Sequence, residues 1–175
     1  MILISHRGNL NGAIPERENT KEYIQEALDL GFHVEIDIWR EDNKLYLGHD
    51  RAENEVEEQW LLDRRKKILV HAKNPEALFY LTRSSISRDE CLSVFFHEND
   101  RYTIIQNGRN NLGVLVDGLI WADDTTNLNS KCVVPILHKM DWDKLNHPDN
   151  RSAQISKQKV WGICSDYIDF LNKNK

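Results

Sequence analysis

Short apolar runs alternate with amphipathic helical segments through the first half of the chain. The runs Ile2–Ile4, Phe32–Trp39 and Ile68–Lys73 have the length and the β-branched content of strands. Between the first two runs, residues 20–30 carry apolar side chains at helical spacing, and Gly31 ends that segment. Strands that alternate with helices are typical of parallel βαβ units, so the sequence predicts an α/β protein.

Local signals place the helix boundaries. Asn19 is expected to cap the first helix, with Glu22 three residues later completing a capping box. A second helix is predicted over residues 53–62. A third begins at Pro75, which suits a first helical turn, with Asn74 as its cap.

In the second half of the chain, the sequence predicts shorter helices and strands. A frayed helix is expected near Asp141–Leu145 and a terminal helix through Leu171, capped by Ser165 or Asp166. No linker, repeat or low-complexity tract is visible, so residues 1–175 are predicted to form one domain. Further extended segments are expected at Lys44–Asp50, Val94–His97, Tyr102–Gln106, Val114–Val116, Leu119–Trp121, Cys132–Ile136 and Val160–Asp166.

The strand Phe32–Trp39 carries an unusual pair of acids. Alternation places Glu35 and Asp37 on one face and the apolar residues on the other, with the two acids roughly 6–7 Å apart along the strand. One interpretation is a solvated outer face, as in half-exposed antiparallel sheets. The other is a pair of oxygen ligands for a hard cation such as Mg²⁺ or Ca²⁺.

Polar residues gather at the carboxyl ends of several predicted strands. In parallel α/β folds these ends converge on one face, where active sites form. Each histidine taken alone is also compatible with a hydrogen-bonded core residue or a surface residue, but their convergence favours a site. The residues at or near these ends are His6, Arg7, Glu35, Asp37, His49, His71, Lys73 and His97.

These residue types suit phosphodiester chemistry. Two carboxylates can hold a divalent ion that polarises a phosphoryl oxygen. Arg7 and Lys73 add positive charge for an anionic substrate. Histidines titrate near neutral pH, so two of them can divide the proton transfers of an in-line displacement.

The charge and composition of the chain limit the classes of partner that it is expected to bind. The formal net charge of −5 and the lack of a basic stripe disfavour a nucleic-acid partner. No apolar run approaches the ~20 residues needed for a transmembrane helix, and the apolar start is too short for a signal sequence. The widely spaced Cys91, Cys132 and Cys164 form no metal-finger pattern, which favours a reducing, cytoplasmic location.

Four motifs in order carry a family resemblance. They are His6-Arg7-Gly8, Glu18-Asn19-Thr20, Glu35-x-Asp37 and His49-Asp50, and the closing Gly162–Tyr167 segment adds a fifth. Together they resemble the glycerophosphodiester phosphodiesterase group of the phospholipase-C-like TIM-barrel superfamily. The resemblance implies that His6 and His49 form the acid–base pair, that Glu35 and Asp37 hold Mg²⁺ or Ca²⁺, and that Arg7 and Lys73 contact the phosphate. In this family an internal glycerol hydroxyl commonly attacks first, and water then opens the cyclic phosphate.

The chain departs from the family in two respects. His71 stands where the family usually has a third acidic ligand, and an imidazole ligand shifts metal preference toward Mn²⁺ or Zn²⁺ or weakens binding. The chain is also shorter than the ~250 residues of a typical (β/α)₈ barrel, and Asp123–Ser130 is too short for a usual crossover helix. We therefore expect a trimmed or incomplete TIM-type (β/α) barrel of parallel strands that retains the first half and its site.

The leading interpretation is a metal-dependent phosphoric diester hydrolase that acts on a small glycerophosphodiester. A related alternative is a lyase resembling sphingomyelinase D, which needs an apolar entrance for acyl chains. A third is a non-catalytic relic that binds phosphate or another ligand, in keeping with His71 and the reduced length. The aromatic residues that could line an apolar entrance are Trp39, Trp60, Phe95, Phe96 and Trp121.

Overall fold

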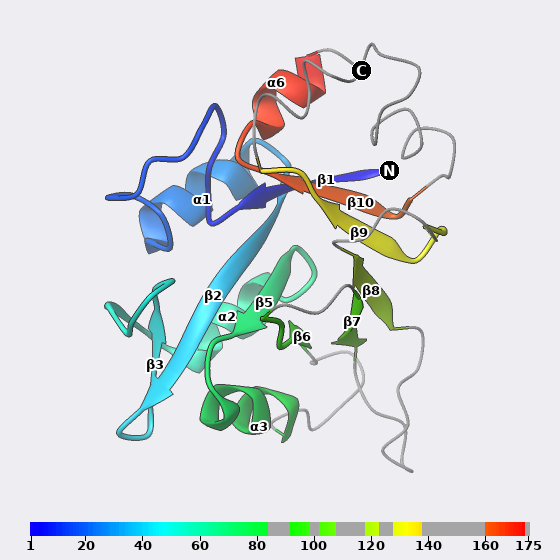
Figure 1. Ribbon diagram of the computed structural model, residues 1–175. Helices are drawn as coiled ribbons and strands as arrows, with labels where there is room; N and C mark the ends of the chain where they lie inside the picture. Colours follow the sequence, from blue (N-terminus) through cyan, green and yellow to red (C-terminus); the bar gives the residue numbers. More distant parts are fainter. Residues whose placement is uncertain (84–91, 99–101, 108–117, 123–127, 138–159, 174–175) are drawn as a thin grey trace.

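The computed structural model describes residues 1–83, 92–98, 102–107, 118–122, 128–137 and 160–173. In this part of the chain a curled, mixed and largely parallel sheet forms a half-barrel, with helices packed on its outer side (Figure 1). The predicted α/β class is confirmed. No helix within the described ranges has both the length and the apolar character needed to cross a membrane.

The elements follow the predicted order closely. The helices are α1 (Lys21–Asp29), α2 (Glu58–Arg64), α3 (Pro75–Arg83) and α6 (Ile168–Lys173). The strands are β1 (Ile2–His6), β2 (His33–Glu41), β3 (Lys44–Leu47), β4 (Asn54–Val56), β5 (Ile68–Ala72), β6 (Ser93–Phe95), β7 (Tyr102–Asn107), β8 (Leu119–Ala122), β9 (Cys132–Pro135) and β10 (Gly162–Ser165).

The half-barrel is built from parallel strands that lie far apart in sequence. β1 lies between β10 and β2, β10 continues to β9, and β2 continues to β5, all in parallel register. The first and last described strands are therefore neighbours, as Figure 1 shows in blue and orange-red. Consequently the carboxyl ends of β1, β2, β5 and β10 open on the same side of the sheet.

The prediction that all strands are parallel is wrong for four strand pairs of the described sheet. β3 is antiparallel to β2, and β4 is antiparallel to β3. The tight turn between β2 and β3 places Asp42 and Asn43 at φ values of 46° and 64°. Two positive φ angles are what a two-residue hairpin turn requires. β7 is antiparallel to both β6 and β8.

The reversal of β7 has a physical cause in chain length. Only residues 96–101 separate β6 from β7, whereas a parallel connection needs a dozen residues or more. A hairpin is the connection that fits. The short strands β6, β7 and β8 pair in series and connect β5 to β9 within the sheet.

The two faces of β2 have different surroundings. Val34, Ile36 and Ile38 are fully buried in the core that the sheet forms with α1, α2 and α3. The opposite face looks into the curl, where a second core contains Ile4, Leu69, Phe95, Ile105, Leu119, Trp121, Val133 and Cys164. Glu35 and Asp37 lie on this inward face with exposures of 2% and 0%, so the solvated-face interpretation is wrong.

Some local predictions also need correction. Thr20, rather than Asn19, caps α1: the Tyr23 backbone N–H donates to its hydroxyl at 3.3 Å. Residues 54–56 form β4 instead of the first turns of a helix, because they pair with β3. The Asn74 cap of α3 is confirmed, since its side chain accepts the Ala77 N–H at 2.9 Å. The predicted elements at Val114–Val116 and Asp141–Leu145 lie outside the described residues.

Candidate metal centre and active site

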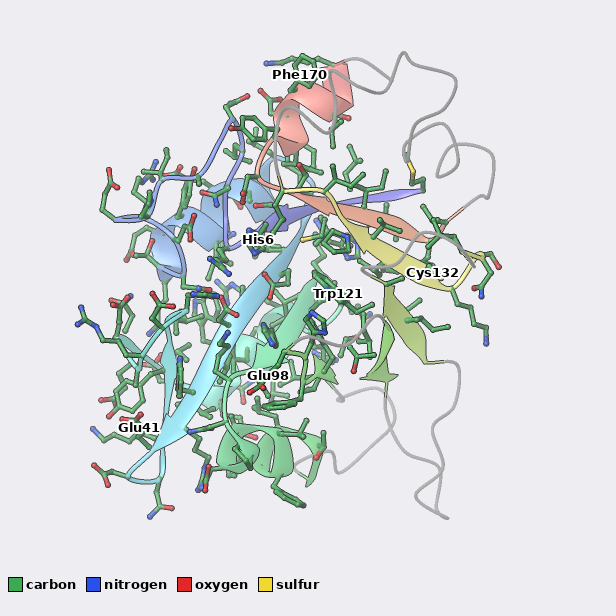
Figure 2. All side chains as sticks on the ribbon, in the orientation of Figure 1. His6, Glu41, Glu98, Trp121, Cys132 and Phe170 are labelled. Carbon is green, nitrogen blue, oxygen red and sulfur yellow. The ribbon has the colours of Figure 1, made fainter. Side chains whose placement is uncertain are left out.

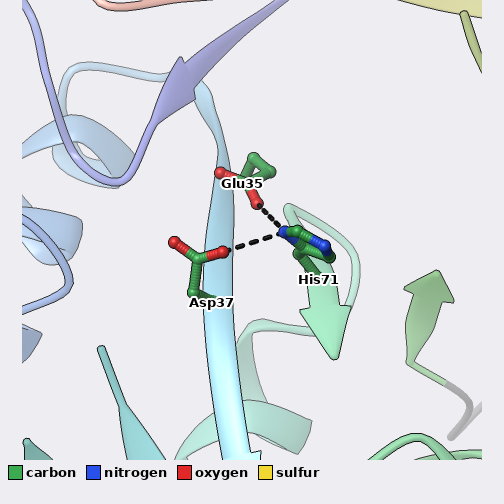
Figure 3. Close-up of side chains that lie close together, drawn as sticks. All are labelled: Glu35, Asp37 and His71. Carbon is green, nitrogen blue, oxygen red and sulfur yellow. Dashed lines mark hydrogen bonds and ion pairs between the residues drawn. The ribbon is translucent and has the colours of Figure 1, made fainter. Parts of the chain in front are cut away.

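Strand register brings the predicted acids and histidines together. Glu35 is the partner of His6 across β1 and β2, and Asp37 is the partner of His71 across β2 and β5. Glu35, Asp37 and His71 each direct one ligand atom into a group whose atoms all lie within 4.8 Å of one another (Figure 3). His71 Nδ1 is 2.9 Å from Asp37 Oδ1 and 3.9 Å from Glu35 Oε1. This buried group can hold a metal ion.

The orientation of His71 suits a metal ligand. Its Nε2 lies 2.9 Å from the carbonyl oxygen of His97, and its ring stacks on Phe95 at a centroid distance of 4.9 Å. A carbonyl oxygen only accepts hydrogen bonds, so Nε2 carries a proton and Nδ1 faces the carboxylates. Metal-binding histidines commonly donate their second ring N–H to a backbone carbonyl in this way.

Asp37 is held in the charged form. Burial acts to raise its pKa, but the His71 hydrogen bond and the positive charge of Arg7 outweigh burial and hold the pKa well below the usual range. Lys73 adds further positive charge, with Nζ 3.7 Å from Oδ1. Asp37 therefore offers an ionised oxygen to a cation throughout the physiological pH range.

The surroundings of Glu35 indicate whether a cation fits into this group. Burial first, and then the charge of Asp37, raise the pKa of this carboxyl. Its Oε2 atom is buried and has no hydrogen-bond partner among the described residues. A buried carboxylate oxygen without a partner costs free energy that a bound cation would offset. The donor set of two carboxylates and one imidazole is therefore compatible with a divalent metal ion.

His6 is oriented by Asp166. His6 Nδ1 lies 2.7 Å from Asp166 Oδ1, and Asn9 Nδ2 donates to the same oxygen at 2.8 Å. The other nitrogen, Nε2, faces Glu35 Oε2 at 3.8 Å. Burial acts to lower the pKa of His6, but the hydrogen bond with Asp166 and the charge of Glu35 outweigh it and raise that pKa above its ordinary value. His6 can thus hold or release a proton at Nε2, beside the metal group.

The two predicted phosphate ligands lie beside the metal group but differ in how closely they pair with protein carboxylates. Arg7 Nε is 2.9 Å from Asp37 Oδ2 and its Nη1 donates to Glu18 at 3.2 Å. Arg7 is thus paired with two protein carboxylates. Lys73 has the longer contact to Asp37, at 3.7 Å, so its charge is less fully paired with protein carboxylates than that of Arg7.

His49 lies at the rim of the site rather than in its centre. Its side chain is 41% exposed, and its Nδ1 is 2.7 Å from Asp50 Oδ1. The neighbouring Gly48 donates its backbone N–H to the Asp37 carbonyl oxygen at 3.3 Å, which anchors this loop beside the middle of β2. His97, by contrast, contributes its backbone carbonyl to His71.

The aromatic residues considered for an apolar entrance are mostly core. Phe95 and Trp121 are buried inside the curl and stack on each other at 4.8 Å, and Figure 2 shows Trp121 enclosed by the sheet. Trp60 packs against the outer core. Trp39 is tied to the rim by its indole N–H, which donates to the Gly48 carbonyl at 2.8 Å. This arrangement does not favour the lyase with an acyl-chain entrance.

Sequence reasoning missed the roles of two residues. Asp166 and Asn19 were both expected to cap helices, yet their side chains contact His6 and Asp37. Both stand in motifs that carry the family resemblance, and that membership was the available signal. Comparisons of the chain with protein-family models, curated proteins and solved structures found no match. The family resemblance therefore stays a prediction from the motifs.

Proposed function

We propose that the protein is a metal-dependent phosphoric diester hydrolase that acts on a glycerophosphodiester-like substrate. The observation that carries the proposal is the unpartnered Oε2 of Glu35, buried between His6 and the metal group. A buried carboxyl oxygen that no protein group hydrogen-bonds is expected where a cation binds. A proton-transferring imidazole beside that position suits displacement at phosphorus.

Glu35, Asp37 and His71 would hold the divalent ion. When bound, such an ion polarises a phosphoryl oxygen and neutralises charge that develops on the phosphate. Oxygen ligands suit Mg²⁺, and the imidazole extends the preference to Mn²⁺ or Zn²⁺. Ca²⁺, which takes six to eight oxygen ligands, is less well served by a centre with one nitrogen donor.

The other residues have roles that follow from their contacts. Asp166 keeps the His6 ring turned so that Nε2 faces the substrate side. His49, at the rim, is the second member of the acid–base pair, so that one imidazole deprotonates the attacking hydroxyl and the other protonates the leaving alkoxide. Lys73 binds the phosphate as a point charge. Arg7 holds Asp37 in place rather than serving first as a phosphate ligand.

The proposal is tested by assaying the purified chain on glycerophosphodiesters with Mg²⁺, Ca²⁺ or Mn²⁺, with and without chelator. We expect metal-dependent turnover that His6→Ala and His49→Ala each abolish while circular dichroism stays unchanged. His33→Asn is the matched control, because His33 is the first residue of β2 and its ring packs edge-on against Trp161, whereas the metal group consists of Glu35, Asp37 and His71. Wild-type rates in both variants would refute these roles. Binding of the diester without turnover would favour the ligand-binding relic.

A further inference from the structure

Asn19 occupies an unusual position in the loop before α1. It is 1% exposed and its backbone has a φ of 54°, a left-handed conformation that asparagine adopts more readily than most residues. Its N–H donates to the Arg7 carbonyl at 3.1 Å, and its own carbonyl accepts from Asn54 Nδ2 at 3.3 Å. Since Thr20 caps the helix, Asn19 is not needed for that purpose.

The side chain of Asn19 binds Asp37 at two points. Its Nδ2 donates to Asp37 Oδ2 at 2.9 Å, and its Oδ1 accepts the Asp37 backbone N–H at 3.0 Å. One amide thus holds both the backbone and the carboxylate of the same residue. This closed arrangement fixes the side-chain torsion of Asp37 and the plane of its carboxylate.

The two carboxylate oxygens of Asp37 therefore have different contact partners. Oδ2 is occupied by Asn19 and lies 2.9 Å from Arg7 Nε. Oδ1 alone faces His71 Nδ1, at 2.9 Å. With Oδ2 engaged on the far side, the carboxylate can present a single oxygen to a cation.

We infer that Asn19 is a positioning residue that restricts Asp37 to one ligand oxygen and thereby makes the centre selective for small octahedral ions over Ca²⁺. This inference rests on the metal site of the proposed function. Ca²⁺ commonly takes a carboxylate through both oxygens, whereas Mg²⁺ needs octahedral ligands about 2.0–2.1 Å away. Ligands at right angles around such an ion lie about 3 Å apart. The 2.9 Å between Asp37 Oδ1 and His71 Nδ1 matches that spacing.

The test measures metal binding to the full chain, without substrate, by isothermal titration calorimetry with Mn²⁺, Mg²⁺ and Ca²⁺. Asn19→Gly removes the amide but tolerates the positive φ, so the backbone stays unstrained. Asn54→Ala is the matched control, because it removes a hydrogen bond to the Asn19 carbonyl and leaves both bonds to Asp37 intact. Asn19→Ser, whose hydroxyl can replace only one of the two bonds, serves if the glycine variant does not fold.

We expect the wild-type chain to bind Mn²⁺ and Mg²⁺ more tightly than Ca²⁺, and Asn19→Gly to reduce that ratio of dissociation constants about tenfold. The Asn54→Ala ratio should equal that of the wild type. A merely structural role would lower the melting temperature and leave the ratio unchanged, which would overturn the inference alone. Normal metal selectivity without diester turnover would instead overturn only the hydrolase proposal. A wild-type chain that binds none of the ions would overturn both.

Discussion

His6 Nδ1 lies 2.7 Å from Asp166 Oδ1, which joins the end of β1 to the turn after β10. Asn9 donates to the same carboxylate oxygen, so Asp166 is itself held in place. Because this contact occupies Nδ1, the orientation of the ring and the availability of Nε2 are set before any substrate arrives. The pair therefore links the fold of the half-barrel directly to the proposed proton transfer.

Asp166→Asn should lower kcat about 100-fold or more and leave KM nearly unchanged. The amide is almost isosteric, but it removes the charge that favours the protonated ring and can impose the wrong tautomer. Steady-state kinetics on a glycerophosphodiester measures the effect. Asp169→Asn, which removes an exposed contact to Lys173 on α6, is the control and should leave both constants unchanged. A wild-type kcat in Asp166→Asn would show that Asp166 does not act through His6.

Glu35→Gln should abolish metal-induced stabilisation and leave the metal-free protein within about 1 kcal/mol of wild type. The reason is that Glu35 carries a buried oxygen without a hydrogen bond, so little native interaction is lost with its charge. A metal at 100 times its dissociation constant adds about 2.7 kcal/mol to the wild-type free energy of unfolding. Thermal unfolding with chelator and with Mn²⁺ measures both effects, with the exposed Glu57→Gln as control. Equal Mn²⁺ stabilisation of Glu35→Gln and wild type would exclude Glu35 as a ligand.

His71→Asp should shift metal preference toward Mg²⁺ and Ca²⁺ and lower affinity for Zn²⁺ at least tenfold. The substitution replaces the nitrogen donor by a third carboxylate. Without metal, three clustered carboxylates repel one another, so the variant should also be less stable in chelator than wild type. Competition titrations with a chromogenic chelator give the affinities, and His71→Asn separates loss of the ring from gain of charge. Unchanged Zn²⁺ affinity in both variants would mean that His71 does not reach the ion.

The imidazoles of His6 and His33 should titrate on opposite sides of pH 6.5 in the metal-free protein. The contacts of His6 with Asp166 and Glu35 outweigh burial and raise its pKa, whereas burial and the charge of Lys67 lower the pKa of His33. The stability due to His6 is fully present below pH 6.5 and is lost as the pH rises through its folded pKa. For His33 the sign reverses, and stability is lost as the pH falls below 6.5.

Proton NMR of the two rings in chelator measures both midpoints. Asp166→Asn should lower the His6 midpoint and leave that of His33 in place. A His6 midpoint below 6.5 in the wild-type chain would contradict the effect assigned to Asp166.

The local pattern of polar and apolar residues was sufficient to predict much of this fold. The two-residue period along β2 separated Glu35 and Asp37 from Val34, Ile36 and Ile38, and the helical spacing of residues 20–30 located α1. The pattern could not tell whether the acidic face meets water or the inside of a curled sheet. That outcome depends on the pairing of β1 with β10, which no local window contains.

The errors also arise from long-range contacts. Residues 54–56 are polar and compatible with a helix, but pairing with β3 makes them a strand. Asn19 and Asp166 have the sequence signature of helix caps, and local rules assign them that role. Their partners lie 18 and 160 positions away, so only the assembled sheet shows that they serve the candidate site.

Because β1 and β10 are neighbours in the sheet, the candidate site can be completed only late in protein synthesis. A ribosome releases His6 early, but that residue must wait for more than 150 further amino acids before its carboxylate partner leaves the exit tunnel. Until β10 pairs with β1, Glu35 and Asp37 are not enclosed on that side and stay exposed to water. Nascent chains stalled before residue 166 should therefore be unable to carry out the proposed hydrolysis, however well their first strands have formed.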